Sequence, residues 1–100
     1  MRVNQKNISQ IKSVIAANVS CNYVLKLFGS RVDDNKLGGD IDLMLIVESE
    51  NIKQVKECKY YILDKIYELI GEQKIDLLIV TEEMISEDPF LKSIDNSILL

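Results

Sequence analysis

The sequence predicts a mixed α/β domain, in which a sheet of three or four strands is flanked by helices. Two segments carry apolar residues at three- and four-residue steps, which is typical of amphipathic helices. Three short segments are apolar almost throughout, which is typical of strands covered on both faces. Because 100 residues suffice for one modest core, we expect a single domain over 1–100.

The elements are justified in order along the chain. Isoleucine and valine at helical spacing predict a first helix over 8–17, with Asn4 or Asn7 as its N-cap. A second, longer amphipathic helix covers 52–70 and ends at Gly71. The β-rich or apolar runs predict three strands: 23–28, 41–47 and 74–80.

Three further segments are less regular. Residues 29–39 contain three of the four glycines and predict a loop or a short helix. Asp88 followed by Pro89 is typical of a helix start, and this helix is expected to continue to Ile94. The tail over 97–100 is either an edge strand or a docking segment.

The composition excludes several kinds of chemistry. The chain has no His, and its two cysteines, Cys21 and Cys58, follow no motif, so neither a Ser-His-Asp triad nor a zinc site is expected, and no disulfide is predicted. A general base must then be a carboxylate, Lys, Tyr or a metal-bound hydroxide. A net charge of −4 argues against a broad nucleic-acid-binding face. No apolar run approaches the roughly 18 residues that cross a bilayer, and no signal peptide is predicted, so we expect a cytoplasmic protein.

Three carboxylates stand in predicted strands, where charge is costly. Asp40 and Asp42 are two residues apart at the head of a strand, so their side chains share a face, and Asp76 is the charged residue inside another apolar strand. A divalent cation would compensate the charge, and an all-oxygen set of ligands suits Mg²⁺ or Mn²⁺. The competing interpretation is a solvent-exposed strand entrance with no ligand.

Small residues near these acids favour the metal-site interpretation. Gly29 and Ser30 directly follow a strand, where backbone N–H groups can approach phosphate oxygens. Gly38 and Gly39 directly precede the acids and allow a tight turn into the strand.

The string Leu27-Phe28-Gly29-Ser30-Arg31, followed by Asp40-Ile41-Asp42-Leu43, resembles the signature of the DNA polymerase beta-type nucleotidyltransferase superfamily. The third acid, in Ile75-Asp76-Leu77, matches as well. The chain is most similar to the minimal nucleotidyltransferases, which are commonly paired with a helical partner of the HEPN type. The resemblance implies the nucleotidyltransferase fold.

The resemblance also implies residue roles. Gly29, Ser30, Arg31 and Gly39 would bind the nucleotide, and the three acids Asp40, Asp42 and Asp76 would be catalytic and hold two Mg²⁺ ions, with Mn²⁺ as a substitute. Asp76 would also help to position or deprotonate the attacking hydroxyl. The chain departs from the family at Gly39, where Ser is usual, and at Asp33-Asp34, whose charges would repel phosphate if they faced it.

The expected function is Mg²⁺-dependent transfer of AMP, or another nucleoside monophosphate, from a nucleoside triphosphate to a hydroxyl of a partner protein. The resemblance implies a HEPN-type partner and an antitoxin role in a toxin–antitoxin pair. One alternative is a non-catalytic subunit that neutralises or complements its partner by binding. Another is the nucleotide-binding half of a two-chain enzyme that modifies a small molecule. Oligomer formation is left open.

Overall fold

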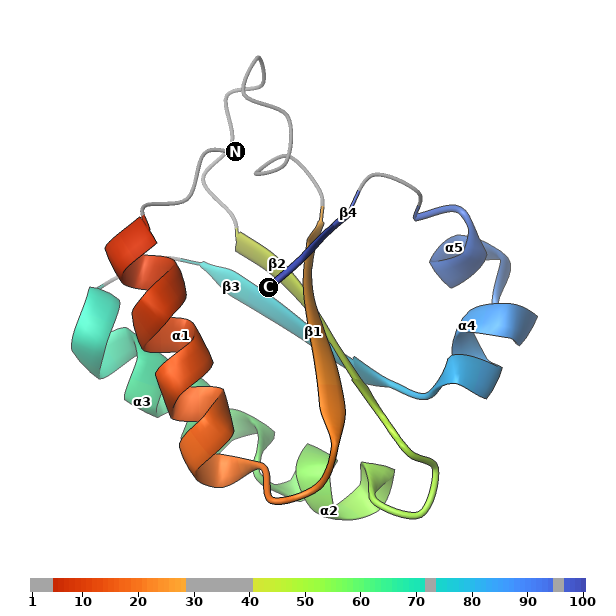
Figure 1. Cartoon of the computed structure of the whole chain (residues 1–100), viewed down its shortest axis with the longest axis horizontal. Coiled ribbons are helices and arrows are strands. Elements are labelled where there is room, and N and C mark those ends of the chain that lie inside the picture. Colours follow the sequence, from red (N-terminus) through yellow and green to blue (C-terminus); the bar gives the residue numbers. More distant parts are fainter. Residues whose placement is uncertain (1–4, 29–40, 72–73, 95–96) are drawn as a thin grey trace.

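The computed structural model describes residues 5–28, 41–71, 74–94 and 97–100. These residues form one sheet with helices on both of its faces, as Figure 1 shows. The four strands are β1 (Tyr23–Phe28), β2 (Ile41–Val47), β3 (Ile75–Val80) and β4 (Ser97–Leu99). The sheet order is β3-β2-β1-β4, so β1 and β2 are central. This architecture confirms the predicted mixed α/β fold.

The sheet is mixed because β2 and β3 run parallel while β1 is antiparallel to both of its neighbours. The parallel connection from β2 to β3 passes through α2 (Ile52–Glu57) and α3 (Lys59–Ile70), as a crossover connection requires. The tail, which the sequence left open, forms the edge strand β4 beside β1. Its pairing is extended by a hydrogen bond of 2.8 Å from the Leu100 N–H to the Leu25 carbonyl.

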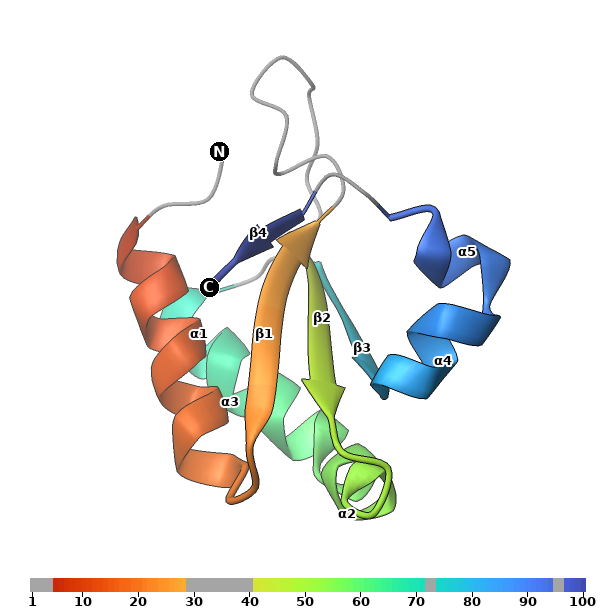
Figure 2. The same ribbon diagram turned by 45° about the vertical axis from the view of Figure 1, so that its right-hand side comes forward.

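The larger core lies between the sheet and the helices α1 (Gln5–Asn18) and α3, which pack on the same face (Figure 2). Alternate residues of the central strands point into it, and those with less than 2% exposure include Leu27, Leu43 and Leu45. Isoleucines of α1 and α3 complete the packing, with Ile15 and Ile62 fully buried. The isoleucine and valine positions of the predicted first helix are thus confirmed as core positions.

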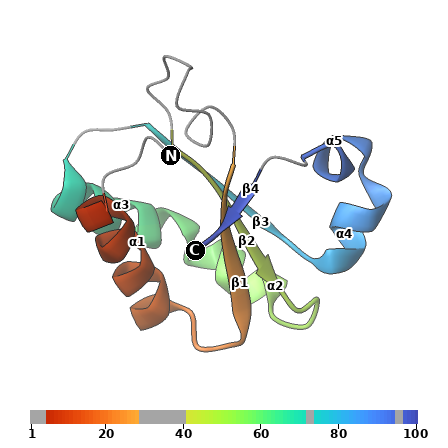
Figure 3. The ribbon, with the colours of Figure 1, turned by 45° about the horizontal axis from the view of Figure 1, so that its top comes forward.

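The opposite face of the sheet carries a smaller core under α4 (Glu82–Glu87) and α5 (Pro89–Lys92), seen from another direction in Figure 3. Met44 and Ile46 of β2 contribute to it together with Val80 of β3 and Leu91 of α5. Because both faces are covered here, β2 buries every residue from Leu43 to Val47. This explains its nearly continuous apolar sequence.

The helices differ from the prediction in two places between 52 and 88. The predicted long helix is divided at Cys58, whose N–H bonds to the Val55 carbonyl three residues back, before α-helical bonding resumes from Ile62 to Cys58. The helix α4 was not predicted, because six residues are too few to show a helical period. Its N-cap Thr81 accepts a hydrogen bond of 3.1 Å from the Met84 N–H.

Some of the predicted helix ends are confirmed and others are wrong. Asn7 lies inside α1 and is therefore not its N-cap, while Asn4 lies outside the described residues. Gly71 ends α3 with a positive φ, as predicted. Asp88 caps α5 by accepting a hydrogen bond of 2.8 Å from the Phe90 N–H, although α5 ends at Lys92 and not at Ile94. No helix among the described residues is long and apolar enough to cross a membrane.

Candidate active site

Two of the three predicted catalytic acids lie side by side on neighbouring strands. Asp42 of β2 and Asp76 of β3 are register partners in the parallel pair, so their Cα atoms are about 4.8 Å apart. Register partners in a sheet point to the same face. The pairing therefore places two carboxylates together, although they are 34 positions apart in the sequence.

The two carboxylates differ in exposure because of where their strands lie. Asp42 is half-buried in a central strand, whereas Asp76 is exposed on β3, which is an edge strand. The exposed carboxylate can meet a ligand from solvent, while the half-buried one is held between two neighbouring strands. The pair thus combines a fixed inner carboxylate with an accessible outer one.

The acids belong to a row that crosses the whole sheet. Phe28 of β1 is the register partner of Asp42, and Ser97 of β4 is the register partner of Phe28. The row therefore runs Asp76, Asp42, Phe28, Ser97, with one residue from each strand. It lies at the end of the sheet where β1 finishes and β2, β3 and β4 begin.

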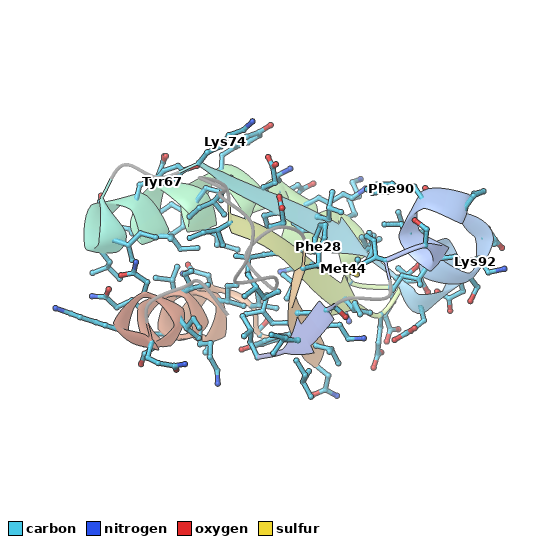
Figure 4. The ribbon with its side chains drawn as sticks, turned by 90° about the horizontal axis from the view of Figure 1, so that it is seen from above. Phe28, Met44, Tyr67, Lys74, Phe90 and Lys92 are labelled. Carbon is cyan, nitrogen blue, oxygen red and sulfur yellow. The ribbon has the colours of Figure 1, made fainter. Side chains whose placement is uncertain are left out.

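The face that carries this row is the one covered by α4 and α5. Met44 and Leu78, two residues further along β2 and β3, belong to the smaller core on this face. In Figure 4, Phe28 and Met44 lie on the side of the sheet toward α5, and Tyr67 of α3 lies on the other side. The acid pair consequently lies next to the apolar residues of the smaller core, at the point where α4 and α5 no longer cover this face of the sheet.

The carboxylates fit a hard divalent cation. Two carboxylates one strand spacing apart repel each other unless a cation or hydrogen-bond donors compensate them. The atoms that would ligate a metal here are carboxylate oxygens, and the chain has no His to add a nitrogen ligand. Such a set of ligands suits Mg²⁺ or Mn²⁺. Among the described residues, no group of three or more acidic or thiol side chains gathers as a complete metal site. Completion of the set depends on Asp40, which lies outside the described residues.

The predicted nucleotide-binding residues Gly29, Ser30, Arg31 and Gly39 also lie outside the described residues. Connectivity still relates them to the row, because the segment 29–40 directly follows Phe28 and directly precedes Ile41. Phe28 and Asp42 are the register pair nearest to this segment. The described residues on either side of this segment, Phe28 and Ile41, therefore lie beside the acid pair.

A hollow at the other end of the sheet has a different character. It measures about 560 Å³ and is rimmed by Glu48, Glu50, Glu82 and Glu83, with Val24 and Ile46 on its wall. A hydrogen bond with Glu50, and then repulsion from its charge, raises the pKa of Glu48. The lining includes no Lys or Arg, so this hollow is unsuited to a triphosphate.

Sequence reasoning did not associate Phe28 or Ser97 with the acids as neighbours in one row. The sequence marks Phe28 as the last residue of a strand and as part of the string that carries the family resemblance, and the tail that contains Ser97 has two interpretations. Alternation along each strand gives the face of a side chain but not its register with other strands. No signal in the sequence predicts that β4 pairs with β1 at this level.

Known proteins resemble this chain in structure, and not significantly in sequence. No protein-family model matches the sequence, and no curated protein matches it significantly. Solved structures do match. A putative nucleotidyltransferase from Sulfolobus solfataricus superposes with a TM-score of 0.62 and 18% identity, over 94% of this chain and 76% of that one. A second structure of the same description has a TM-score of 0.61 and 20% identity, over 93% of this chain and 96% of the other.

The chain has a nucleotidyltransferase fold. The second match spans nearly all of both chains, so the strands and helices described above make up almost the whole of that relative's fold. The nucleotidyltransferase fold implied by the sequence resemblance is thereby confirmed. In this chain, the nucleotidyltransferase fold brings Asp42 and Asp76 into register at one end of the sheet.

Proposed function

We propose that this protein is a Mg²⁺-dependent nucleotidyltransferase that transfers AMP, or another nucleoside monophosphate, from a nucleoside triphosphate to a hydroxyl of a partner protein. The register of Asp42 with Asp76 is the observation that carries the proposal. It is supported by the fold and by the Gly-Ser and Asp-x-Asp signature of the sequence. Neither half of that signature is specific alone. The pairing of Asp42 with Asp76 on neighbouring strands supports the metal-dependent chemistry that the signature suggests.

The acids would hold the cations. Asp42 is half-buried and held in a central strand, which suits a residue whose oxygens must keep a defined position. Asp76 is exposed, so it can face the incoming acceptor hydroxyl as well as a cation. Asp40 would complete the set. Bound Mg²⁺ lowers the pKa of an attacking hydroxyl and neutralises charge on the leaving pyrophosphate.

The remaining parts of the site have separate tasks. Gly29, Ser30, Arg31 and Gly39 would contact the nucleotide, as the family resemblance implies. The strand residues on either side of their segment lie beside the acid pair, which supports this role. Asp76 would accept or orient the proton of the acceptor hydroxyl, a task that a carboxylate can perform in a chain without His.

We also propose that the acceptor is a HEPN-type helical protein and that this chain is the antitoxin of the pair, acting in the cytoplasm. The support is the resemblance to minimal nucleotidyltransferases.

The test begins with metal and nucleotide and needs no acceptor. Binding of Mn²⁺ and of ATP with Mg²⁺ is measured by calorimetry for the wild type and for Asp42→Asn, Asp76→Asn and Asp64→Asn. Asp64 is an exposed aspartate of α3 and serves as the matched control. We expect Asp42→Asn and Asp76→Asn to weaken metal-dependent binding at least tenfold and Asp64→Asn to leave it unchanged.

A second step measures transfer. The protein encoded by the gene next to that of this chain is incubated with this chain and ATP, and the mass of that protein is then determined. An added AMP group supports the enzyme, whereas partner binding without any metal-dependent nucleotide binding identifies the non-catalytic subunit. Metal-dependent nucleotide binding without modification of the partner directs the search to a small-molecule acceptor.

A further inference from the structure

The two cysteines of the chain lie on the same small cavity. Cys21 and Cys58 both line a space of about 20 Å³, together with residues that include Asn18, Gln54 and Val55. They are 37 positions apart in the sequence, and both thiols are free. Tertiary structure therefore brings together two reactive groups that no motif connects.

Each cysteine belongs to a junction between elements. Cys21 lies between α1 and β1, and Cys58 is the residue at which α2 ends and α3 begins. The turn after α1 and the helix α2 lie at the same end of the sheet (Figure 1). Both side chains pack against the larger core and are only partly buried, so reagents in solution can reach them.

The cavity that the two cysteines share is small. A space of 20 Å³ accommodates about one water molecule. Disulfides join residues whose Cα atoms are about 4.4–6.8 Å apart. The two junctions must therefore approach within that range for a bond to form.

We propose that Cys21 and Cys58 form a reversible intramolecular disulfide when the protein meets an oxidised low-molecular-weight thiol. The thiolate of one cysteine attacks the disulfide of the oxidant, which releases one thiol and leaves a mixed disulfide on the protein. The second thiolate attacks the protein sulfur of that mixed disulfide and releases the other thiol. The protein loses two electrons and two protons, and the oxidant gains both.

The bond would tie the start of β1 to the junction of α2 and α3. It lies at the opposite end of β1 from Phe28, the register partner of Asp42. The bond closes a loop of 38 residues, counted from Cys21 through Cys58. A loop of this length constrains the unfolded chain, and we expect oxidation to raise the melting temperature by about 10 °C.

The experiment treats the full chain with glutathione disulfide and analyses it by mass spectrometry and non-reducing peptide mapping. The expected product is a monomer about 2 Da lighter than the reduced chain, with one peptide pair linked through Cys21 and Cys58. Dithiothreitol should restore the original mass and the original melting temperature.

Cys21→Ser and Cys58→Ser are the matched controls. Each should gain the mass of one glutathione and keep it, because the chain then has no second thiol that could displace the glutathione. Thermal unfolding of the reduced variants shows whether they fold as the wild type does. The proposal is overturned if the folded wild type takes up glutathione at both cysteines, forms only interchain dimers, or does not react.

Discussion

Asp42 and Asp76 stand side by side as register partners of two parallel strands, one half-buried and the other exposed. Their different exposure follows from sheet order, since β2 is central and β3 is at the edge. Like charges one strand spacing apart destabilise a sheet unless a cation or hydrogen-bond donors compensate them. Metal binding should therefore depend on this pair.

Asp76→Asn removes one of the two charges. In the presence of a chelator, we expect this variant to match the stability of the wild type to within about 0.5 kcal/mol, because the changed side chain is exposed. Addition of Mg²⁺ or Mn²⁺ should raise the melting temperature of the wild type but not that of the variant. Thermal unfolding with and without metal measures both effects, and Asp64→Asn should respond to metal as the wild type does. Equal stabilisation of Asp76→Asn by metal would contradict the assignment.

Leu43→Ala tests the larger core. Leu43 is fully buried in the central strand β2 and pairs with Leu27 on one side and with Leu77 on the other. Its truncation should lower the free energy of unfolding by about 3 kcal/mol, through lost burial and a cavity between rigid strands. Urea unfolding measures this, with Leu99→Ala as the control. Leu99 is 69% exposed, so its loss should cost less than about 0.5 kcal/mol.

Gly71→Ala tests the end of α3. Gly71 has φ 85° and ψ −169°, and its N–H donates a hydrogen bond of 2.9 Å to the Tyr67 carbonyl. A Cβ atom at this position meets nothing within 4 Å, so the cost arises from the backbone alone and should be about 1–3 kcal/mol.

The companion variant Gly71→Asn separates two explanations for that cost. Asparagine tolerates the left-handed helical conformation, but the extended ψ of Gly71 is not of that kind. We therefore expect Asn to be no better than Ala in urea unfolding. Recovery of stability by Asn would show that the backbone adopts the ordinary left-handed helix cap.

Glu48 should make stability depend on pH. A hydrogen bond with Glu50, and then its charge, raises the pKa of Glu48 above the ordinary value of 4.5. The folded state thus holds its proton to higher pH than the unfolded state, so the stabilisation is complete below about 4.5 and is lost as the pH rises through the raised pKa. Unfolding at a series of pH values should show a weaker decline for Glu48→Gln. Glu87→Gln, an exposed change on α4, should keep the decline of the wild type.

The sequence alone predicted much of the fold because the relevant signals are local. Apolar periodicity located α1, and short apolar or β-rich runs located the three longer strands. The Asp88-Pro89 pair and Gly71 marked helix ends through their own backbone chemistry. Helix α4 and the division at Cys58 escaped prediction, because the first is too short to show a period and the second changes one hydrogen bond without changing the apolar pattern.

The site was predictable as a set of residue types and not as an arrangement. Two acids at the head of one apolar strand and one acid inside another indicated an all-oxygen metal site, since isolated charge in a strand is costly. The register of the two strands decides which residue of β2 lies beside Asp76 of β3. Register depends on packing across the whole sheet. Only the tertiary structure placed Asp76 beside Asp42, set Phe28 and Ser97 in the same row, and brought Cys21 to Cys58.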